Sequence, residues 1–210
     1  MSALQKNFMV RRTKQEAQAT RSRILDTAEL VFEQRGVSGT SLHEIAKAAG
    51  LTRGAIYWHF ADKADLFNAM MERATMPLEE GGVCGFGVAD QTLEEMRRGL
   101  RELLKRIVAD PQMRRVFEIA THKVEYVGEL LAVRERHLRV RNECLVDMDR
   151  ALKAAIRRGE LARRMPARAA AIGLHALLDG LIRNWTLDPS GFDLVKVGSQ
   201  ALDAYLAGLA

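Results

Sequence analysis

Residues 42–60 read LHEIAKAAGLTRGAIYWHF, and this stretch decides the fold of the first third of the chain. Ser41, directly before it, stands three residues ahead of Glu44, and this capping-box spacing predicts the start of a short helix. Gly50 permits the left-handed backbone of a tight turn. Thr52 then provides the N-cap of a second short helix. Two short helices joined by such a turn are typical of a helix-turn-helix.

The second of these helices carries a surface suited to contact with double-stranded DNA. Its inner side is apolar, so Arg53, Gly54, Tyr57, Trp58 and His59 are expected to point outward. Arg53 is the only lysine or arginine on this helix, and it is the candidate bidentate partner of a guanine. The alternative is an ordinary helical hairpin in which Tyr57 and Trp58 are buried.

The chain ahead of this motif is basic. The 210 residues carry 32 Lys and Arg against 27 Asp and Glu, a formal net charge of +5. Between Lys6 and Arg23, Glu16 is the only acidic residue among six basic ones, which include Arg11 and Arg12. A basic arm of this kind suits a polyanion, because each neutralised phosphate releases a counterion. The alternative is a frayed, solvated terminus.

The remaining sequence favours helices almost throughout, so we expect an all-α fold. Only 4 prolines interrupt the chain, and Gly36 and Gly159 are expected to end helices. Thr92 with Glu95 forms a second capping box. The stretch 76–90, with four glycines and a proline, is the expected flexible loop. The predicted helices cover residues 14–35, 42–49, 52–59, 62–75, 92–109, 129–158, 166–187 and 192–209. One more helix is expected to begin at residues 110–111.

Composition argues against several other classes of protein. Two cysteines are too few for a disulfide framework, and no signal-peptide-like run or uncharged 18-residue stretch is present. We therefore expect a cytoplasmic protein that makes no membrane contact. The sequence has no glycine-rich phosphate loop, nucleophile elbow or converging metal ligands, so we predict no enzyme activity, cofactor or metal. Cys84 with Cys144 leaves a redox switch as an alternative.

The helix-turn-helix region also resembles the DNA-binding signature of the TetR family of transcriptional repressors. The similarity is densest over residues 40–63, TSLHEIAKAAGLTRGAIYWHFADK, and it extends from Thr20 to Leu66. Two further stretches, 9–14 and 179–185, are similar to the subgroup that represses multidrug efflux pumps.

This resemblance implies a two-part, all-helical homodimer. Residues 1–63 would form the N-terminal arm and a three-helix DNA-binding head, with a connecting helix that continues to about residue 75. Residues 64–210 would form the ligand-binding and dimerising body. The resemblance places Thr52, Arg53, Gly54, Tyr57 and His59 against the operator, and Thr40, Ser41 and Lys63 against phosphates.

The last two predicted helices have an unusual composition. Residues 169–182 are apolar nearly all round, which requires burial on several sides, and their small residues permit close helix approach. We therefore predict a four-helix interface with the same pair from a second chain. The alternative is the core of a monomeric bundle. The residues assigned to the dimer interface are Gly173, Ala176, Gly180, Leu202, Tyr205 and Leu206.

His175, Asp179 and Arg183 recur at four-residue spacing and therefore share one face of a helix. In one interpretation they form a hydrogen-bonded ladder, because an unpaired carboxylate in apolar surroundings is costly. In the other, Asp179 is the polar anchor for a small molecule in an apolar cavity. The other residues assigned to the wall of this cavity are Phe117, Thr121, His122, Glu125, Cys144 and Leu178.

Together these features predict a TetR-type repressor that controls a multidrug efflux operon. It would bind a near-palindromic operator in double-stranded DNA as a homodimer and leave it when a hydrophobic small-molecule inducer binds the body. Two alternatives are a redox- or metal-responsive regulator that uses the same head, and a small helical enzyme or adaptor that does not act on DNA.

Overall fold

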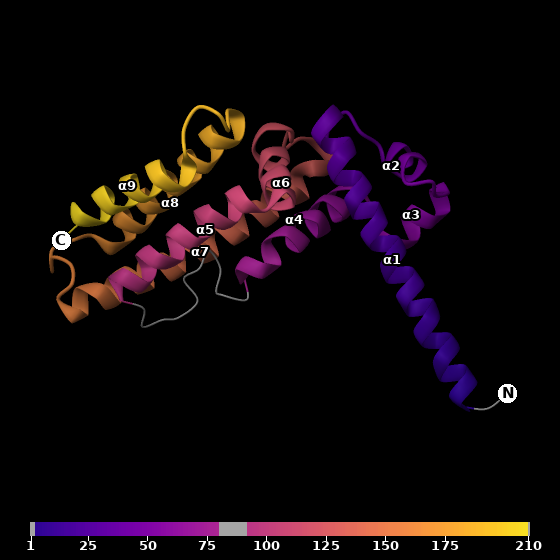
Figure 1. Ribbon diagram of the computed structural model, residues 1–210, viewed down its shortest axis with the longest axis horizontal. Coiled ribbons are helices and arrows are strands. Elements are labelled where there is room, and N and C mark those ends of the chain that lie inside the picture. Colours follow the sequence, from indigo (N-terminus) through magenta and orange to yellow (C-terminus); the bar gives the residue numbers. More distant parts are fainter. Residues whose placement is uncertain (1–2, 80–91, 210) are drawn as a thin grey trace.

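A computed structural model describes the backbone of residues 3–79 and 92–209 and the side chains of residues 14–75 and 92–209. Every regular element in these ranges is helical, as predicted, and none of the helices there is long and apolar enough to cross a bilayer. Figure 1 shows α1, α2 and α3 at one end of the molecule and α8 and α9 at the other. The elements are α1 (Ala3–Arg35), α2 (Leu42–Ala48), α3 (Arg53–His59), α4 (Lys63–Glu79), α5 (Leu93–Ala109), α6 (Pro111–His122), the 3-10 turn η2 (Gly128–Leu130), α7 (Leu131–Arg158), α8 (Ala167–Leu187) and α9 (Leu194–Ala207).

The helix ends follow from local capping chemistry. Ser41 Oγ accepts a hydrogen bond from the backbone N–H of Glu44 at 3.3 Å, and the Glu44 carboxylate accepts one from the Ser41 N–H at 2.8 Å. Thr92 and Glu95 form the same reciprocal pair at the start of α5. Gly159 ends α7 with a φ of 76°. These ends confirm the predicted boundaries, since each cap satisfies backbone groups that the helix leaves unpaired.

Two helices are longer than predicted. α1 begins at Ala3, and residues 3–13 contain neither glycine nor proline that would end it earlier. The predicted start was too late because the apolar spacing used to place it begins only at Ile24. α4 continues to Glu79, so the first residues of the predicted 76–90 loop are helical, and residues 80–91 lie outside the described part of the chain.

The first hydrophobic core lies between the head and the body. Its buried side chains come from α1 to α4 and also from α6 and the start of α7. Phe32 of α1 and Phe67 of α4 meet within it, with ring centroids 6.2 Å apart. Ile119 of α6 and Val133 of α7 are buried in the same cluster. The head is therefore packed against the body as well as joined to it through α4.

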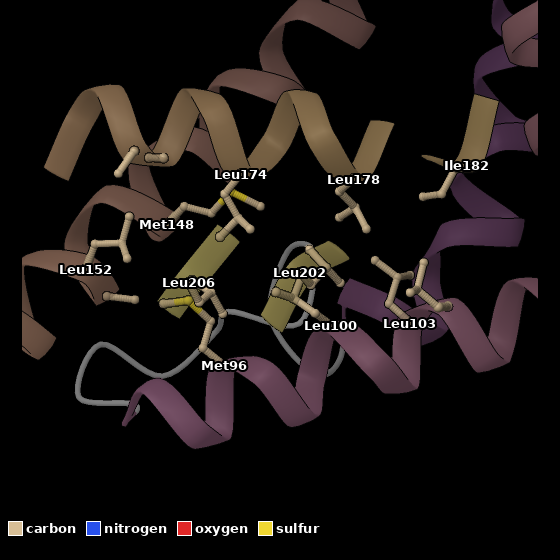
Figure 2. Close-up of a cluster of buried hydrophobic side chains, with 14 of the residues drawn as sticks. Met96, Leu100, Leu103, Met148, Leu152, Leu174, Leu178, Ile182, Leu202 and Leu206 are labelled. Atoms are coloured by element: carbon tan, nitrogen blue, oxygen red, sulfur yellow. The ribbon is translucent and has the colours of Figure 1, made fainter. Parts of the chain in front are cut away.

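The second core fills the body between α5, α7, α8 and α9. Figure 2 shows Leu174 and Leu178 of α8 opposite α5, with Leu202 and Leu206 of α9 pointing into the same interior. Leu202 is 2% and Leu206 0% exposed in the single chain. Their predicted place at a dimer interface is wrong, because α9 turns this face toward α5 and α8 of its own chain.

The other residues assigned to the interface divide into two groups. Gly173 and Tyr205 contact each other within the chain: a Cβ at Gly173 would overlap Tyr205 Oη, which donates a hydrogen bond to the Ala170 carbonyl at 2.9 Å. Ala176 is exposed, and nothing described lies within 4 Å of a Cβ placed at Gly180. Ala176 and Gly180 therefore remain available to a second chain.

Candidate DNA-binding surface and ligand cavity

Helix α3 presents an outward face that starts at its N-cap. Thr52 Oγ1 accepts a hydrogen bond from the Ala55 N–H at 3.2 Å, which fixes the first turn. The Arg53 guanidinium lies over the Tyr57 ring, 5.5 Å from its centroid, within the range of a cation–π contact. The exposed residues of this face are Thr52, Arg53, Gly54, Tyr57 and Trp58.

The two aromatic side chains of this face are not part of a core. Tyr57 is 47% and Trp58 73% exposed, which contradicts the alternative of a plain hairpin that buries both. His59 is half-buried, with its ring 4.6 Å from the Trp58 ring in a T-shaped contact. Burial and then the charge of Arg21 lower the pKa of His59, so the imidazole is neutral at pH 7 and offers one donor and one acceptor.

Lys63 and Thr40 do not face solvent as phosphate-contacting side chains would. Lys63 Nζ is buried, donates a hydrogen bond to the Thr40 carbonyl at 2.9 Å and forms an ion pair with Glu129 at 3.0 Å. Thr40 is also buried, and its Oγ1 donates to the Gly36 carbonyl at 2.7 Å. The phosphate-contacting roles assigned to these two side chains are therefore corrected to structural ones. Lys63 connects the loop before α2 with η2 of the body.

Ser41 and the N-terminal arm are the two other parts of the predicted DNA surface. Ser41 is exposed at the start of α2, where its hydroxyl is engaged with Glu44 and the α2 N-terminus faces outward. Arg11 and Arg12 lie on the N-terminal part of α1, which extends away from the rest of the molecule in Figure 1. Their side chains lie outside the described part, so their DNA contact stays a prediction.

A buried carboxylate connects the head to the body. Glu29 of α1 forms an ion pair with Arg73 of α4 and accepts a hydrogen bond from Gln112 Nε2 of α6 at 2.8 Å. Arg115 of α6 lies 3.8 Å from the second Glu29 oxygen and donates to Glu33 of α1 at 3.1 Å. We call Glu29 with these four residues the junction cluster. Its members are distant in sequence, so no spacing pattern predicted it.

A cavity of about 230 Å³ lies in the body, lined mainly by α4, α6, α7 and α8. Its wall is largely apolar, which suits the rings or chains of a hydrophobic ligand. The apolar side chains that line it are Phe67, Met71, Leu103, Phe117, Ala120, Val133, Val140, Cys144, Leu178 and Ile182.

Most residues assigned to a ligand site from the sequence lie in this wall. Phe117 and Thr121 come from α6, Cys144 from α7, and the face of α8 that contains His175, Leu178 and Asp179 completes one side. Their role in ligand binding stays a prediction.

His122 and Glu125 are not among the residues that line the cavity. His122 Nε2 instead lies 3.1 Å from both the Arg183 carbonyl and Thr186 Oγ1, so it holds the end of α6 against α8. Glu125 is exposed on the turn that follows α6, and the next residue, Tyr126, faces the cavity in its place. Glu125 was expected on a helix, but α6 ends at His122, three residues before it.

The ladder proposed for His175, Asp179 and Arg183 is not formed. All three side chains line the cavity, and no hydrogen bond or ion pair joins them within the described residues. Asp179 acts at longer range: it opposes the burial that lowers the pKa values of His175 and His137. The interpretation of Asp179 as a cavity-facing anchor therefore remains.

Sequence reasoning missed several polar residues of the wall. Arg136, His137 and Arg141 of α7 line the cavity, and so does Asn68 of α4, whose buried Oδ1 has no partner among the described residues. The charges of α7 look like an ordinary solvated face in the sequence. The one available signal is helical spacing, because His137 and Arg141 stand seven and three residues ahead of Cys144 and therefore share its side of the helix.

The redox and metal alternatives depend on Cys84, Cys144 and clusters of metal-binding side chains. Cys144 lines the cavity, whereas Cys84 lies outside the described residues, so a redox switch between the two stays an alternative. Within the described part of the chain, no three His, Cys, Asp or Glu side chains converge as metal ligands do.

Comparison with known proteins matches both parts of the chain. Residues 24–70 match the family described as bacterial regulatory proteins, tetR family. Residues 91–210 match the C-terminal region of MAATS-type transcriptional repressors. The two matches correspond to the helix-turn-helix head and to the body that holds the cavity.

Individual relatives agree with these matches over nearly the whole chain. The chain is 43% identical to the HTH-type transcriptional regulator AcrR of Shigella flexneri, covering 90% of this chain and 88% of that protein. It is 39% identical to the HTH-type transcriptional regulator TtgR of Pseudomonas putida, covering 89% and 90%. The crystal structure of NalD, the secondary repressor of the MexAB-OprM multidrug efflux pump in Pseudomonas aeruginosa, matches with a TM-score of 0.82 and 32% identity, covering 93% and 97%.

These proteins are transcriptional regulators, which decides against the alternative of a helical enzyme. The exposed α3 face, the capped helix-turn-helix and the two family matches therefore lead to one conclusion. The chain belongs to the TetR family of bacterial transcriptional regulators.

Proposed function

We propose that this protein is a dimeric repressor of a multidrug efflux operon and that a hydrophobic small molecule in the cavity releases it from DNA. The observation that supports this proposal most is that some side chains belong both to the wall of the cavity and to the core of the head. Phe67 of α4 and Val133 of α7 line the cavity and also belong to the core that buries α1, α2 and α3. Packed cores transmit displacements, so a ligand that moves α4 also moves the head.

The efflux operon is proposed from the relatives. NalD is named as a repressor of a multidrug efflux pump, and it is similar to this chain over both head and body. The largely apolar surface of the cavity supports the same target, because hydrophobic compounds are what such a surface accepts. The repressor would act in the cytoplasm, where the operator lies.

The dimer is proposed from the outward face of α8 and α9. Ile172 is 50% exposed, Ala176, Val197 and Ala204 are also exposed, and Gly180 is open to close approach. A two-fold interface uses the same patch on both chains, and small residues let the helices pack closely. Two α3 helices would then enter successive major grooves, about 34–36 Å apart or a multiple of this distance.

The deciding experiment is a footprint on the DNA that flanks the protein's own gene, with and without a panel of hydrophobic antibiotics and dyes. We expect a near-palindromic protected site that is lost when one of the compounds binds. Linkage requires the operator to weaken ligand binding by the same factor, about 5- to 150-fold for a typical coupling. A protected asymmetric half-site would contradict the dimer.

The variant Ile172→Glu separates dimerisation from folding. Because the Ile172 side chain is half-exposed in the single chain, the change should leave its fold intact while placing two carboxylates at the proposed interface. Sedimentation should then show monomers, and protection of the operator should be lost. A dimeric Ile172→Glu variant would place the interface elsewhere.

A further inference from the structure

The cavity combines its apolar wall with an excess of positive charge. Arg136 and Arg141 of α7 and Arg183 of α8 line it, whereas Asp179 is the only carboxylate among the described residues of the wall. We call these three arginines the arginine cluster. None of their guanidinium groups forms an ion pair with a carboxylate of the described residues.

The charge of the cluster converges on one part of the wall. Burial lowers the pKa of His137, Asp179 raises it, and Arg141, Arg183 and Arg136 each lower it further. His137 and the three arginines line the same cavity. The Tyr126 ring, 6.2 Å from the His137 ring, adds an aromatic surface beside it.

Several arginines that join helices of this protein have acidic partners. Arg73 and Arg115 belong to the junction cluster, and Arg101 of α5 donates to both oxygens of Asp203 in α9 at 2.8 and 2.7 Å. The arginine cluster differs, because its members face a cavity and have no such partner within the described residues. Their position indicates an acidic partner that is not part of the chain.

We infer that the cavity selects hydrophobic anions, in which an aromatic body occupies the apolar wall and a carboxylate meets the arginine cluster. The inference rests on the proposed function, since it assigns a chemical class to the inducer of the same cavity. A guanidinium binds a carboxylate through paired charge-assisted hydrogen bonds, and these are stronger where water is partly excluded. Asp179 offsets part of the positive charge and therefore disfavours the anion.

Three compounds built on one ring system test the selection by charge alone. They are 2-naphthoate, 2-naphthamide and naphthalene-2-carboxamidine, which carry an anionic, a neutral and a cationic group of nearly equal size. Each is titrated into the full-length protein by calorimetry. We expect 2-naphthoate to bind roughly tenfold more tightly than the amide, the value of one hydrogen bond to a charged group, and the amidine to bind most weakly.

Variants locate the source of the preference. Arg136→Gln, Arg141→Gln and Arg183→Gln should each reduce the advantage of 2-naphthoate over 2-naphthamide, and Asp179→Asn should increase it. Arg139→Gln is the matched control, because Arg139 lies on the same helix but faces a shallow outer surface of α7 and not the cavity. The control should leave all three affinities unchanged, and operator binding without compound checks that each variant is folded.

The outcomes separate this inference from the proposed function. Equal binding of the three compounds, tighter binding of the amidine, or no binding by any of them would overturn selection for anions. If the amidine bound most tightly and released the operator, the protein would still be an inducible repressor, but its cavity would select cations. Tight, cluster-dependent binding of 2-naphthoate without operator release would support the inference and contradict the proposed inducer role of the cavity.

Discussion

The DNA-binding surface and the ligand cavity of this protein are constructed in different ways. The surface lies on one short helix, α3, and its exposed residues follow one another between Thr52 and Trp58. The cavity takes its wall from five helices and the turn after α6, so residues as distant as Phe67 and Arg183 meet there. Local chemistry can therefore specify a DNA-binding helix, whereas a cavity depends on how several helices pack.

Buried polar contacts join the head to the body. The junction cluster joins α1, α4 and α6 around Glu29, and Lys63 pairs with Glu129 across the boundary between head and body. Such contacts have defined geometry and discrete partners, so they resist small displacements and respond to larger ones. Substitutions in these contacts are therefore the most direct way to weaken the packing of the head against the body.

The largest effect is expected from Glu29→Gln in the junction cluster. The change leaves Arg73 and Arg115 without their shared buried carboxylate, which should lower the free energy of unfolding by about 3 kcal/mol. Glu33→Gln is the control: it removes a carboxylate from the same Arg115 at a position that is only half-buried and should cost about 1 kcal/mol or less. Urea unfolding measures both. Equal costs would mean that head and body are not held together by the buried carboxylate.

The next effect concerns the head alone. Arg53→Ala should weaken operator binding by about 1–3 kcal/mol and relax base preference if its guanidinium contacts a guanine. Affinity for a cavity ligand in the absence of DNA should stay unchanged. Fluorescence anisotropy with the operator and with single-base variants measures this, with Lys196→Ala on α9 as a charge-matched control. An equal loss of affinity for all operator variants would mean that Arg53 contacts a phosphate and not a base.

A pair of glycines in α8 tests the packing of the body. Gly173→Ala places a methyl group against Tyr205 and should lower the free energy of unfolding by about 1–3 kcal/mol, as overpacking does. Gly180→Ala meets no described atom within 4 Å of the single chain, so in the monomeric Ile172→Glu background it should instead stabilise the helix by about 1 kcal/mol. Thermal unfolding of the two variants compares them. A destabilised Gly180→Ala variant whose loss depends on protein concentration would place this residue in the dimer interface.

The smallest effect is a dependence of stability on pH. Burial lowers the pKa values of His137 and His175 below their ordinary 6.5, with Asp179 opposing and the nearby arginines assisting. Below pH 6.5 the unfolded chain therefore binds protons before the folded chain, and the free energy of unfolding falls until both folded-state imidazoles are protonated. Urea unfolding between pH 7.5 and 5.5 should show a shallower fall in His137→Gln/His175→Gln. Parallel curves would mean that these imidazoles are not desolvated.

The helical class, the helix-turn-helix and most helix ends could be predicted from the amino-acid sequence. Ser41 with Glu44, Thr92 with Glu95, and Gly159 act through groups within a few residues of one another, so the pattern already contains the complete interaction. The exposed face of α3 was predictable for the same reason. The family resemblance covered the same stretch and placed the remaining head residues, two of them in roles that their burial contradicts.

The direction in which the remaining side chains face depends on tertiary packing. Lys63 turns inward because loop carbonyls and Glu129 surround its ammonium group, and Leu202 turns inward because α9 packs on α5. Arg136 and Arg141 face the cavity because α7 lies between α4 and α8. Helical periodicity fixes which residues share a face, but the neighbour of that face is set by helices far away in the sequence.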